Sequence, residues 1–329
     1  MRRREFITLL SVAASWPLAV PAQPVERIRR VGVLLGISAA ADAEWQARVA
    51  ALKQTLRGLG WIEGTNITFD LRFAEGKPEL LPSLATELVR APSDVIVTSG
   101  SPATEAARAA TKTLPIVMVS VGDALAAGFI TNLARPGGNI TGQTLVATEQ
   151  SAKRLELVKE LFSNAGKIGV LWNGNNTGHS FQFKEIQRVA PSLGIELISL
   201  PVRGETELEP ALRTVVEAAS PVILSMDDSL IGFLRAQTIE FCLRNKIALI
   251  GEFRFTPAAG GLISYGPNTV ELWRLISSHV DKILRGAKPG DLPVHQPTKF
   301  ELVINLKTAK AIGISIPNTL IDRADEVIE

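Results

Sequence analysis

Two short polar strings in the sequence have the residue types needed to hold opposite charges. The first is Thr98-Ser99-Gly100-Ser101-Pro102, in which hydroxyls and a glycine follow an apolar run and Pro102 suits the first turn of a helix. Free backbone N–H groups and the positive dipole at a helix start can hold a carboxylate, and Ser99 and Ser101 add hydroxyl donors. The alternative for Ser101 is that it only caps its own helix.

The second string is Asp227-Asp228, which also follows an apolar run. Acidic side chains there can pair with an α-amino group, so that the two strings together would form a clamp for an amino acid. Asn173 and Asn175 follow another apolar run and can add side-chain hydrogen bonds. The alternative is that Asp228 or Ser229 caps the next helix and that Asp227 is simply solvated.

Further candidates come from the rule that ligands of open α/β sheets lie beyond the carboxyl ends of the strands. Phe253 or Trp172 can stack on an aromatic substituent, although core packing is the alternative for both. The remaining candidate ligand-binding residues follow predicted strands or lie on presumed crossovers between lobes: Ser38, Gly100, Gly122, Asp123, Thr144 and Glu252.

The elements that must position these residues alternate between strands and helices. Continuous apolar runs predict strands that are covered on both faces, and apolar residues at helical spacing predict helices between them. The first set comprises strands at 30–35, 67–73, 95–98 and 116–119 and helices at 45–59, 80–89 and 103–110. This order predicts a doubly wound, mostly parallel sheet.

The same alternation begins again after a segment that we predict to be a loop, Gly137 to Gly142. The second set comprises strands at 167–172, 196–200, 222–225 and 248–250 and helices at 152–161, 181–193, 208–218 and 231–245. A strand at 260–266, a helix at 272–284 and a strand at 300–304 complete the chain. We therefore expect two Rossmann-like lobes with parallel sheets, joined by a multi-strand hinge around a cleft. The expected lobes are 29–142 plus 266–292, and 143–265 plus 293–329.

Composition excludes several classes of function. Hydrophobic content of 46% with 21% charged residues is ordinary for a globular protein. A net charge of only +2 and the lack of a basic, aromatic-rich stripe argue against nucleic acid binding. The single cysteine, Cys242, lies in an apolar helical context and is expected to be a buried structural thiol. The chain has no zinc signature, dinucleotide fingerprint, phosphate loop or nucleophile elbow, so we expect no metal and no cofactor.

The N-terminus has the layout of an export signal, with basic residues, a short apolar run and small residues at Val20-Pro21-Ala22. Arg3-Arg4-Glu5-Phe6-Ile7 fits the twin-arginine pattern, although the general secretory route can use the same segment. The apolar run is shorter than the roughly 20 residues that span a membrane. We expect residues 1–22 to be a signal peptide cleaved near Ala22, and the mature protein to work in the periplasm.

Several strings resemble one bacterial family, the substrate-binding proteins of ABC transporters that include tryptophan-type binders. The most specific is Asp291 to Lys310, DLPVHQPTKFELVINLKTAK, and ARPGGNITG, AKRLEL and GGLISYG are similar to the same family. The resemblance covers essentially the whole chain. It implies a type I periplasmic-binding-protein fold, a monomer, and two partners in the membrane system, a permease and a separate ATPase subunit.

The resemblance and the two polar strings together predict a protein that traps a small molecule, an amino acid or related carboxylate, between its lobes and delivers it to an ABC permease. One alternative is a ligand sensor that works with a membrane receptor and uses the same cleft. Another is an α/β enzyme in which Asp227-Asp228 would serve as general acid and base, although no nucleophile or metal set accompanies them.

Overall fold

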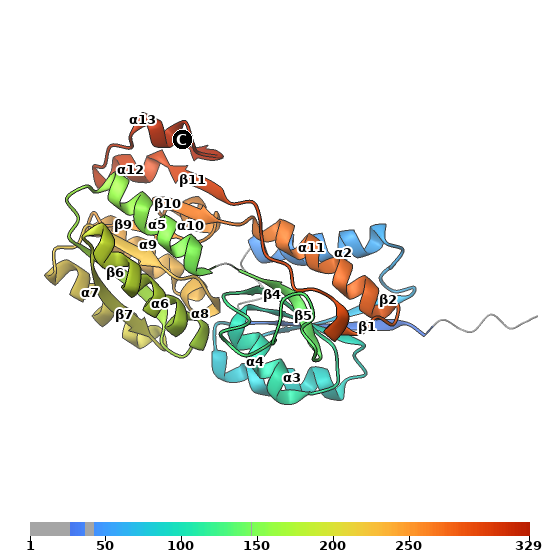
Figure 1. Ribbon diagram of the computed structural model, residues 1–329. Helices are drawn as coiled ribbons and strands as arrows, with labels where there is room; N and C mark the ends of the chain where they lie inside the picture. Colours follow the sequence, from blue (N-terminus) through green and yellow to red (C-terminus); the bar gives the residue numbers. More distant parts are fainter. Residues whose placement is uncertain (1–26, 37–42, 146) are drawn as a thin grey trace, which may run out of the picture.

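The computed structural model describes residues 27–36, 43–145 and 147–329. These residues form two α/β lobes that lie side by side, each built on its own sheet (Figure 1). The predicted fold class is thereby confirmed. Among the described helices, none is both long and apolar enough to cross a membrane. The predicted signal peptide and Ser38 lie outside the described residues.

The first lobe is built on a five-stranded sheet in which all neighbouring strands are parallel. Helices cover both faces, and the central strand β3 is accordingly buried along its whole length. In sheet order the strands are β2 (Ile67–Phe73), β1 (Arg29–Leu35), β3 (Val95–Ser99), β4 (Ile116–Val121) and β5 (Ile140–Thr144).

Helices pack on both faces of this sheet (Figure 1). On one face, α2 (Ala43–Gly58) and α11 (Thr269–Leu284) bury Leu52, Trp273 and their neighbours against the strands. The opposite face is covered by α3 (Leu81–Arg90), which follows the short η1 (Pro78–Leu80), and by α4 (Gly100–Ala110). Because α11 comes late in the chain, the first lobe is completed only after the second has been built.

The second lobe has a seven-stranded sheet that is parallel except where β10 meets β11. In sheet order its strands are β12 (Glu326–Ile328), β11 (Glu301–Asn305), β10 (Ile263–Gly266), β9 (Ala248–Gly251), β8 (Val222–Ser225), β6 (Lys167–Asn173) and β7 (Glu196–Val202).

Two buried clusters, one on each face, make up the core of the second lobe. One cluster draws on α5 (Ala147–Leu161), α6 (Thr177–Val189), η2 (Ala190–Leu193), α12 (Leu306–Ile312) and α13 (Asn318–Ile321). The other draws on α7 (Leu208–Glu217) after η3 (Glu205–Glu207), on α8 (Ser229–Phe233) and on α9 (Arg235–Arg244). The last of these contains Cys242, which is buried as expected, and burial raises the pKa of its thiol to about 12.

The chain passes between the lobes three times: from β5 to α5, from β10 to α11, and from η4 (Pro289–Asp291) to β11. The third passage first extends the edge of β5, since the Thr144 N–H donates to the His295 carbonyl at 3.0 Å and the His295 N–H to the Gly142 carbonyl at 2.9 Å. The predicted multi-strand hinge is therefore present (Figure 1). The exact residue limits predicted for the lobes stay a prediction.

Several predicted elements differ from the structure. The strand predicted over 260–266 begins only at Ile263, and the helix predicted over 181–193 begins at Thr177 and is followed by η2 from Ala190. The segment 137–142 is not all loop, because β5 begins at Ile140. Gly142 has φ +125°, and a Cβ there would lie 2.2 Å from the Met118 carbonyl oxygen. Only glycine therefore allows β5 to lie this close to β4. The helix predicted over 231–245 is interrupted at Leu234, which separates α8 from α9.

The close contact at Gly142 leads to a stability prediction. Gly142→Ala should lower the free energy of unfolding by about 2 kcal/mol or more, because the new methyl group meets backbone atoms at a strained φ. Chemical denaturation would measure this. Gly58→Ala is the matched control: nothing lies within 4 Å of the position that its new methyl group would take, and helix propensity should raise stability by about 0.5–1 kcal/mol. Equal losses at both positions would contradict the packing argument.

Candidate functional site

A cavity of about 680 Å³ lies between the lobes, at the carboxyl ends of strands from both sheets. The first lobe contributes residues from α2 and from the tips of β3 and β4. The second lobe contributes residues that follow β8 and β9 and residues of α6, α8, α9 and α10 (Phe255–Ala258). This is the position that the strand-end rule predicts for a ligand.

The wall contributed by the first lobe carries hydroxyls and the start of a helix. Ser99, Gly100, Ser101 and Gly122 line the cavity, as predicted for ligand-binding residues. Gly100 has φ +79°, which turns the chain from β3 directly into α4. Ser101 does not cap this helix: it is the second helical residue, and Ser99 stands at the N-cap without a side-chain capping bond. The first N–H groups of α4 therefore have no intrahelical partners.

The wall contributed by the second lobe carries two carboxylates side by side. Asp227 and Glu252 both line the cavity, and Asp227 accepts hydrogen bonds from the Glu252 backbone N–H at 3.0 Å and from the Ser225 hydroxyl at 3.2 Å. A Cβ on Gly266 would lie 1.9 Å from the Glu252 carbonyl oxygen, so only glycine allows the end of β10 to pack against this turn.

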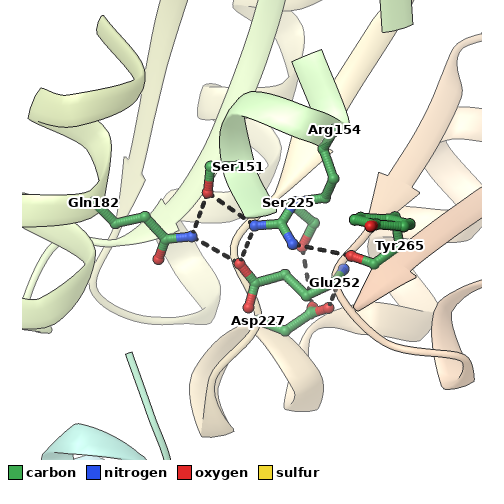
Figure 2. Close-up of polar contacts among 7 residues, drawn as sticks. All are labelled: Ser151, Arg154, Gln182, Ser225, Asp227, Glu252 and Tyr265. Carbon is green, nitrogen blue, oxygen red and sulfur yellow. Dashed lines mark hydrogen bonds and ion pairs between the residues drawn. The ribbon is translucent and has the colours of Figure 1, made fainter. Parts of the chain in front are cut away.

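Behind Glu252 lies a fully buried arginine, Arg154 of α5. Its guanidinium contacts a Glu252 carboxylate oxygen at 2.7 Å, and it also donates to the Ser151 hydroxyl at 2.9 Å and to the Tyr265 carbonyl at 3.1 Å. Gln182 of α6 donates to the same Glu252 oxygen at 2.8 Å and to Ser151 at 2.8 Å. Figure 2 shows Arg154 of α5 and Gln182 of α6 converging on the Glu252 carboxylate, with the Tyr265 carbonyl of β10 on the other side of Arg154.

The surroundings of Asp227 raise the pKa of its carboxyl. Burial, and then the negative charge of Glu252, raise the pKa of its carboxyl from 3.8 to about 7. The Glu252 N–H, the Arg235 guanidinium and the Ser225 hydroxyl act in the opposite direction but are weaker. Asp227 is partly exposed to the cavity and is held by two hydrogen bonds, so it is not simply a solvated surface carboxylate.

Other predicted site residues serve as structural supports. Asp228 accepts from the N–H groups of Leu230 and Ile231 at 3.0 Å and so caps α8, as one alternative proposed. Its second oxygen accepts from Asn173 at 2.7 Å and from Asn176 at 3.0 Å. Asn173, in turn, accepts from the Asn175 N–H at 2.9 Å. Neither Asn173 nor Asn175 lines the cavity.

Two predicted site residues of the first lobe, Asp123 and Thr144, also support the backbone instead of lining the cavity. Asp123 accepts from the N–H groups of Leu125 and Ala126 at 3.0 Å, which orders a turn beside the cavity. Thr144 is buried and bonds the Val121 carbonyl and the Ala124 N–H, so it also supports the backbone. Neither residue lines the cavity.

The two aromatic candidates have different positions. Phe253 lines the cavity and packs on Phe255, with ring centroids 5.5 Å apart. Trp172 stacks on Phe183 at 5.5 Å and donates to Ser199, away from the cavity, so packing is the correct interpretation for it.

Residues on helices complete the cavity, and strand-end reasoning did not find them. Arg48 lies 4.1 Å from the ring centre of Trp45 and 5.3 Å from that of Phe255, and Arg235 lies 4.6 Å from the Phe255 ring centre. These contacts place two guanidinium groups and a group of aromatic rings at one end of the cavity. Further lining residues missing from the prediction are Ser120, Asn176, Gly178, His179, Gln182 and Phe233.

A family model described as ABC transporter substrate binding protein matches residues 31–328. The chain belongs to this family. The predicted resemblance is confirmed, and the protein is a substrate-binding protein of the ABC transporter type.

Known relatives of this substrate-binding protein agree with that assignment. A tyrosine-binding protein of Clostridioides difficile (strain R20291) is 27% identical over 276 residues, which cover 83% of this chain and 79% of the relative. The crystal structure of a conserved domain protein from Vibrio cholerae has a TM-score of 0.86 at 27% identity and covers 92% of this chain and 100% of its own. An ABC domain from Streptococcus pneumonia in complex with L-Trp has a TM-score of 0.83 at 25% identity, with coverage of 91% and 99%.

The lobes of this substrate-binding protein touch each other at the edge of the cavity. Glycines of one lobe face side chains of the other: a Cβ on Gly36 would lie 2.1 Å from the Ser229 hydroxyl, and one on Gly76 would lie 2.5 Å from the Phe233 ring. A Cβ on Gly178 would lie 3.1 Å from the Ser101 hydroxyl. The missing side chains allow the two lobes to approach this closely.

The raised pKa of Asp227 predicts a pH-dependent stability difference. The folded protein binds the Asp227 proton more tightly than the unfolded chain, so this group lowers stability progressively as pH rises from about 4 to about 7. Asp227→Asn removes the effect. The variant should therefore gain stability relative to the natural protein across this range, as measured by urea denaturation at a series of pH values. A difference that does not change with pH would contradict the assignment.

Proposed function

We propose that this substrate-binding protein captures an aromatic α-amino acid in the cavity and delivers it to an ABC permease whose ATPase is a separate subunit. The observation that carries the proposal is the opposite chemistry of the two walls. One wall offers hydroxyls and helix N–H groups, and the other offers carboxylates. An α-amino acid has the complementary pair of charges.

The carboxylate of the ligand would lie at the start of α4. The N–H groups there and the hydroxyls of Ser99 and Ser101 are hydrogen-bond donors, and the helix dipole favours an anion. The backbone of Gly122 adds to the same wall. This assignment retains Ser99, Gly100, Ser101 and Gly122 from the predicted ligand-binding set.

The ammonium group of the ligand would face Asp227, with Glu252 beside it. Burial disfavours the ionised form of the Asp227 carboxyl, and a neighbouring ammonium group stabilises that form. Charge-assisted hydrogen bonds of this kind are about twice as strong as neutral ones. Asp227 is therefore the residue whose side chain we assign to ligand recognition on the second wall.

The side chain of the ligand would contact the aromatic rings that line the cavity. Phe253 supplies apolar surface that suits offset or edge-on contacts with an aromatic group, next to Trp45 and Phe255, whose rings also contact Arg48 and Arg235. The cavity volume of about 680 Å³ lies within the range of pockets that enclose small ligands. Relatives that bind tyrosine and L-Trp support the same ligand class.

A ligand that contacts both walls binds the closed form better and shifts the lobes toward closure. The permease would recognise this closed shape. We further propose that residues 1–22 export the protein, which would then act as a monomer on the outer side of the inner membrane.

A thermal-shift screen of the L-amino acids tests the ligand class. L-Tryptophan or L-tyrosine should raise the midpoint of unfolding, because a ligand that binds only the folded state stabilises it. Tryptamine lacks the carboxylate and indole-3-propionate lacks the ammonium group, so neither should stabilise the protein comparably. Stabilisation by these analogues equal to that by tryptophan would contradict the two-wall clamp.

A carboxyl with a pKa near neutrality would also suit a general acid, so catalysis needs a separate test. If the protein only binds its ligand, mass spectrometry should recover the ligand unchanged after incubation. Turnover of the ligand would contradict a binding role.

The glycine contacts at the cavity edge predict a variant that folds but closes poorly. Gly36→Ala places a methyl group against Ser229 of the other lobe, so L-tryptophan should bind about tenfold more weakly while the free energy of unfolding stays within about 0.5 kcal/mol. Calorimetric titration and denaturation measure the two quantities. Gly204→Ala, with nothing within 4 Å of the new Cβ, is the control and should bind normally. Normal affinity in Gly36→Ala would show that closure does not require this contact.

A further inference from the structure

The second wall of the cavity contains two neighbouring carboxylates, and the buried Arg154 pairs with only one of them. Its guanidinium lies 2.7 Å from Glu252 and is 1% exposed, so water does not screen the pair. Gln182 donates a further hydrogen bond to the same oxygen (Figure 2). Arg154 and Gln182 both stabilise the anionic form of Glu252.

Glu252 also cannot turn away from this arrangement. Arg154 is itself held by the Ser151 hydroxyl and the Tyr265 carbonyl, which fix it between α5 and β10. The Glu252 backbone is fixed by its N–H bond to Asp227 and by the close approach of Gly266. The Glu252 carboxylate is thus held in place by Arg154 and Gln182 on the same wall as Asp227.

Asp227 has weaker support for a negative charge. Its oxygens accept from one backbone N–H and one hydroxyl, and no ion pair joins it to another residue within the described ranges. Arg235 favours its ionised form but does not outweigh burial and the charge of Glu252. The hydrogen-bond partners of Asp227, and the charges of Glu252 and Arg235, all belong to the second lobe, whereas its burial also depends on the first lobe, which forms the opposite wall of the cavity.

We propose that ligand capture releases a proton from Asp227, and that Arg154 is the positioning residue that assigns this proton to Asp227 by holding Glu252 ionised. The inference rests on the proposed binding of an amino acid. The ammonium group enters with its three protons and keeps them. The Asp227 carboxylic acid loses its proton to solvent, and the resulting carboxylate pairs with the ammonium group.

The other charged or titratable groups around this cavity do not take the place of Asp227. Asp228 is occupied by its helix cap and by two asparagine amides. The Nδ1 atom of His179 accepts the Asn173 N–H at 3.2 Å and is therefore engaged in the backbone of its loop. The charged and titratable groups that face Asp227 or line its cavity are Glu252 after β9, Arg235 and Glu240 on α9, Asp228 after β8, His179 on α6 and Arg48 on α2.

Calorimetric titration with L-tryptophan at pH 7, in phosphate and in Tris, tests the coupling. The two buffers have different ionisation enthalpies, so a released proton appears as a difference in binding heat. We expect about half a proton per ligand at pH 7, and an affinity that rises up to about tenfold per pH unit below 7 and levels off above it. Equal heats in both buffers, with normal binding, would overturn this inference and leave the proposed function intact.

Variants assign the proton to a residue. Asp227→Asn should bind L-tryptophan more weakly and release no proton. Asp228→Asn changes the adjacent carboxylate of the same cavity and should still release the proton. Arg154→Lys keeps a cation beside Glu252 and should retain the pH profile. Arg154→Gln removes the cation, so that the two carboxyls share a proton and the midpoint of the profile moves to higher pH. Proton release that persists in Asp227→Asn would overturn the assignment.

A measurement on the ligand-free protein tests the pKa of Asp227 without any amino acid as a probe. Carbon NMR of the aspartate carboxyls should show one group with a midpoint near pH 7 that is absent in Asp227→Asn. If no amino acid binds, the proposed function fails and the coupling fails with it. A ligand-free midpoint below about 5 would overturn the inference even if tryptophan binds.

Discussion

The buried ion pair between Arg154 and Glu252 is the interaction on which the site depends. It joins α5, which begins just after the first crossover, to the turn after β9, and a further bond reaches β10, which leads to the second crossover. Buried ion pairs add little stability over apolar packing, whereas loss of one partner costs about 3–5 kcal/mol because a charge is left uncompensated. Stability alone therefore does not explain why these two residues occupy this place. Glu252 lines the cavity with Arg154 directly behind it, so the pair sets the charge of the cavity wall in the proposed function.

The alternation of strands and helices and the position of the cleft follow from local patterns in the sequence. Parallel strands buried on both faces are continuous apolar runs, and segments such as Val95 to Ser99 are recognisable without any tertiary information. The strand-end rule located Ser99, Ser101, Asp227 and Glu252 at the cavity for the same reason. The strand β5 was not recognised, because its Gly142 is required by a close contact with β4 that no local pattern reveals. The C-terminal β12 has only three residues, too few to give a pattern.

The site residues that sequence analysis missed depend on the arrangement of whole lobes. Trp45 has helical spacing with Val49 and Leu52, so it was indistinguishable from a core residue. Arg48 and Arg235 reach the cavity only because α2 of one lobe and α9 of the other approach the same aromatic ring. Conversely, Asp123 and Asn173 have the right residue type at the right strand end, but backbone groups and neighbouring side chains occupy them. Residue type locates candidates, and the hydrogen-bond partners decide which of them are available to a ligand.

Charge balance explains why neither lobe would suffice alone. Arg154 pairs with Glu252, so Asp227 is the carboxyl of the second wall without an ion-pair partner among the described residues, while the first wall offers a helix dipole and neutral donors. A zwitterion compensates both walls at once, but only when the lobes are close enough for one molecule to reach both. A ligand that carries a single charge leaves one wall in its unfavourable state, either as a buried carboxylate without a partner or as N–H groups without an acceptor. In the proposed function, selectivity for amino acids and closure of the lobes are two consequences of the same electrostatic requirement.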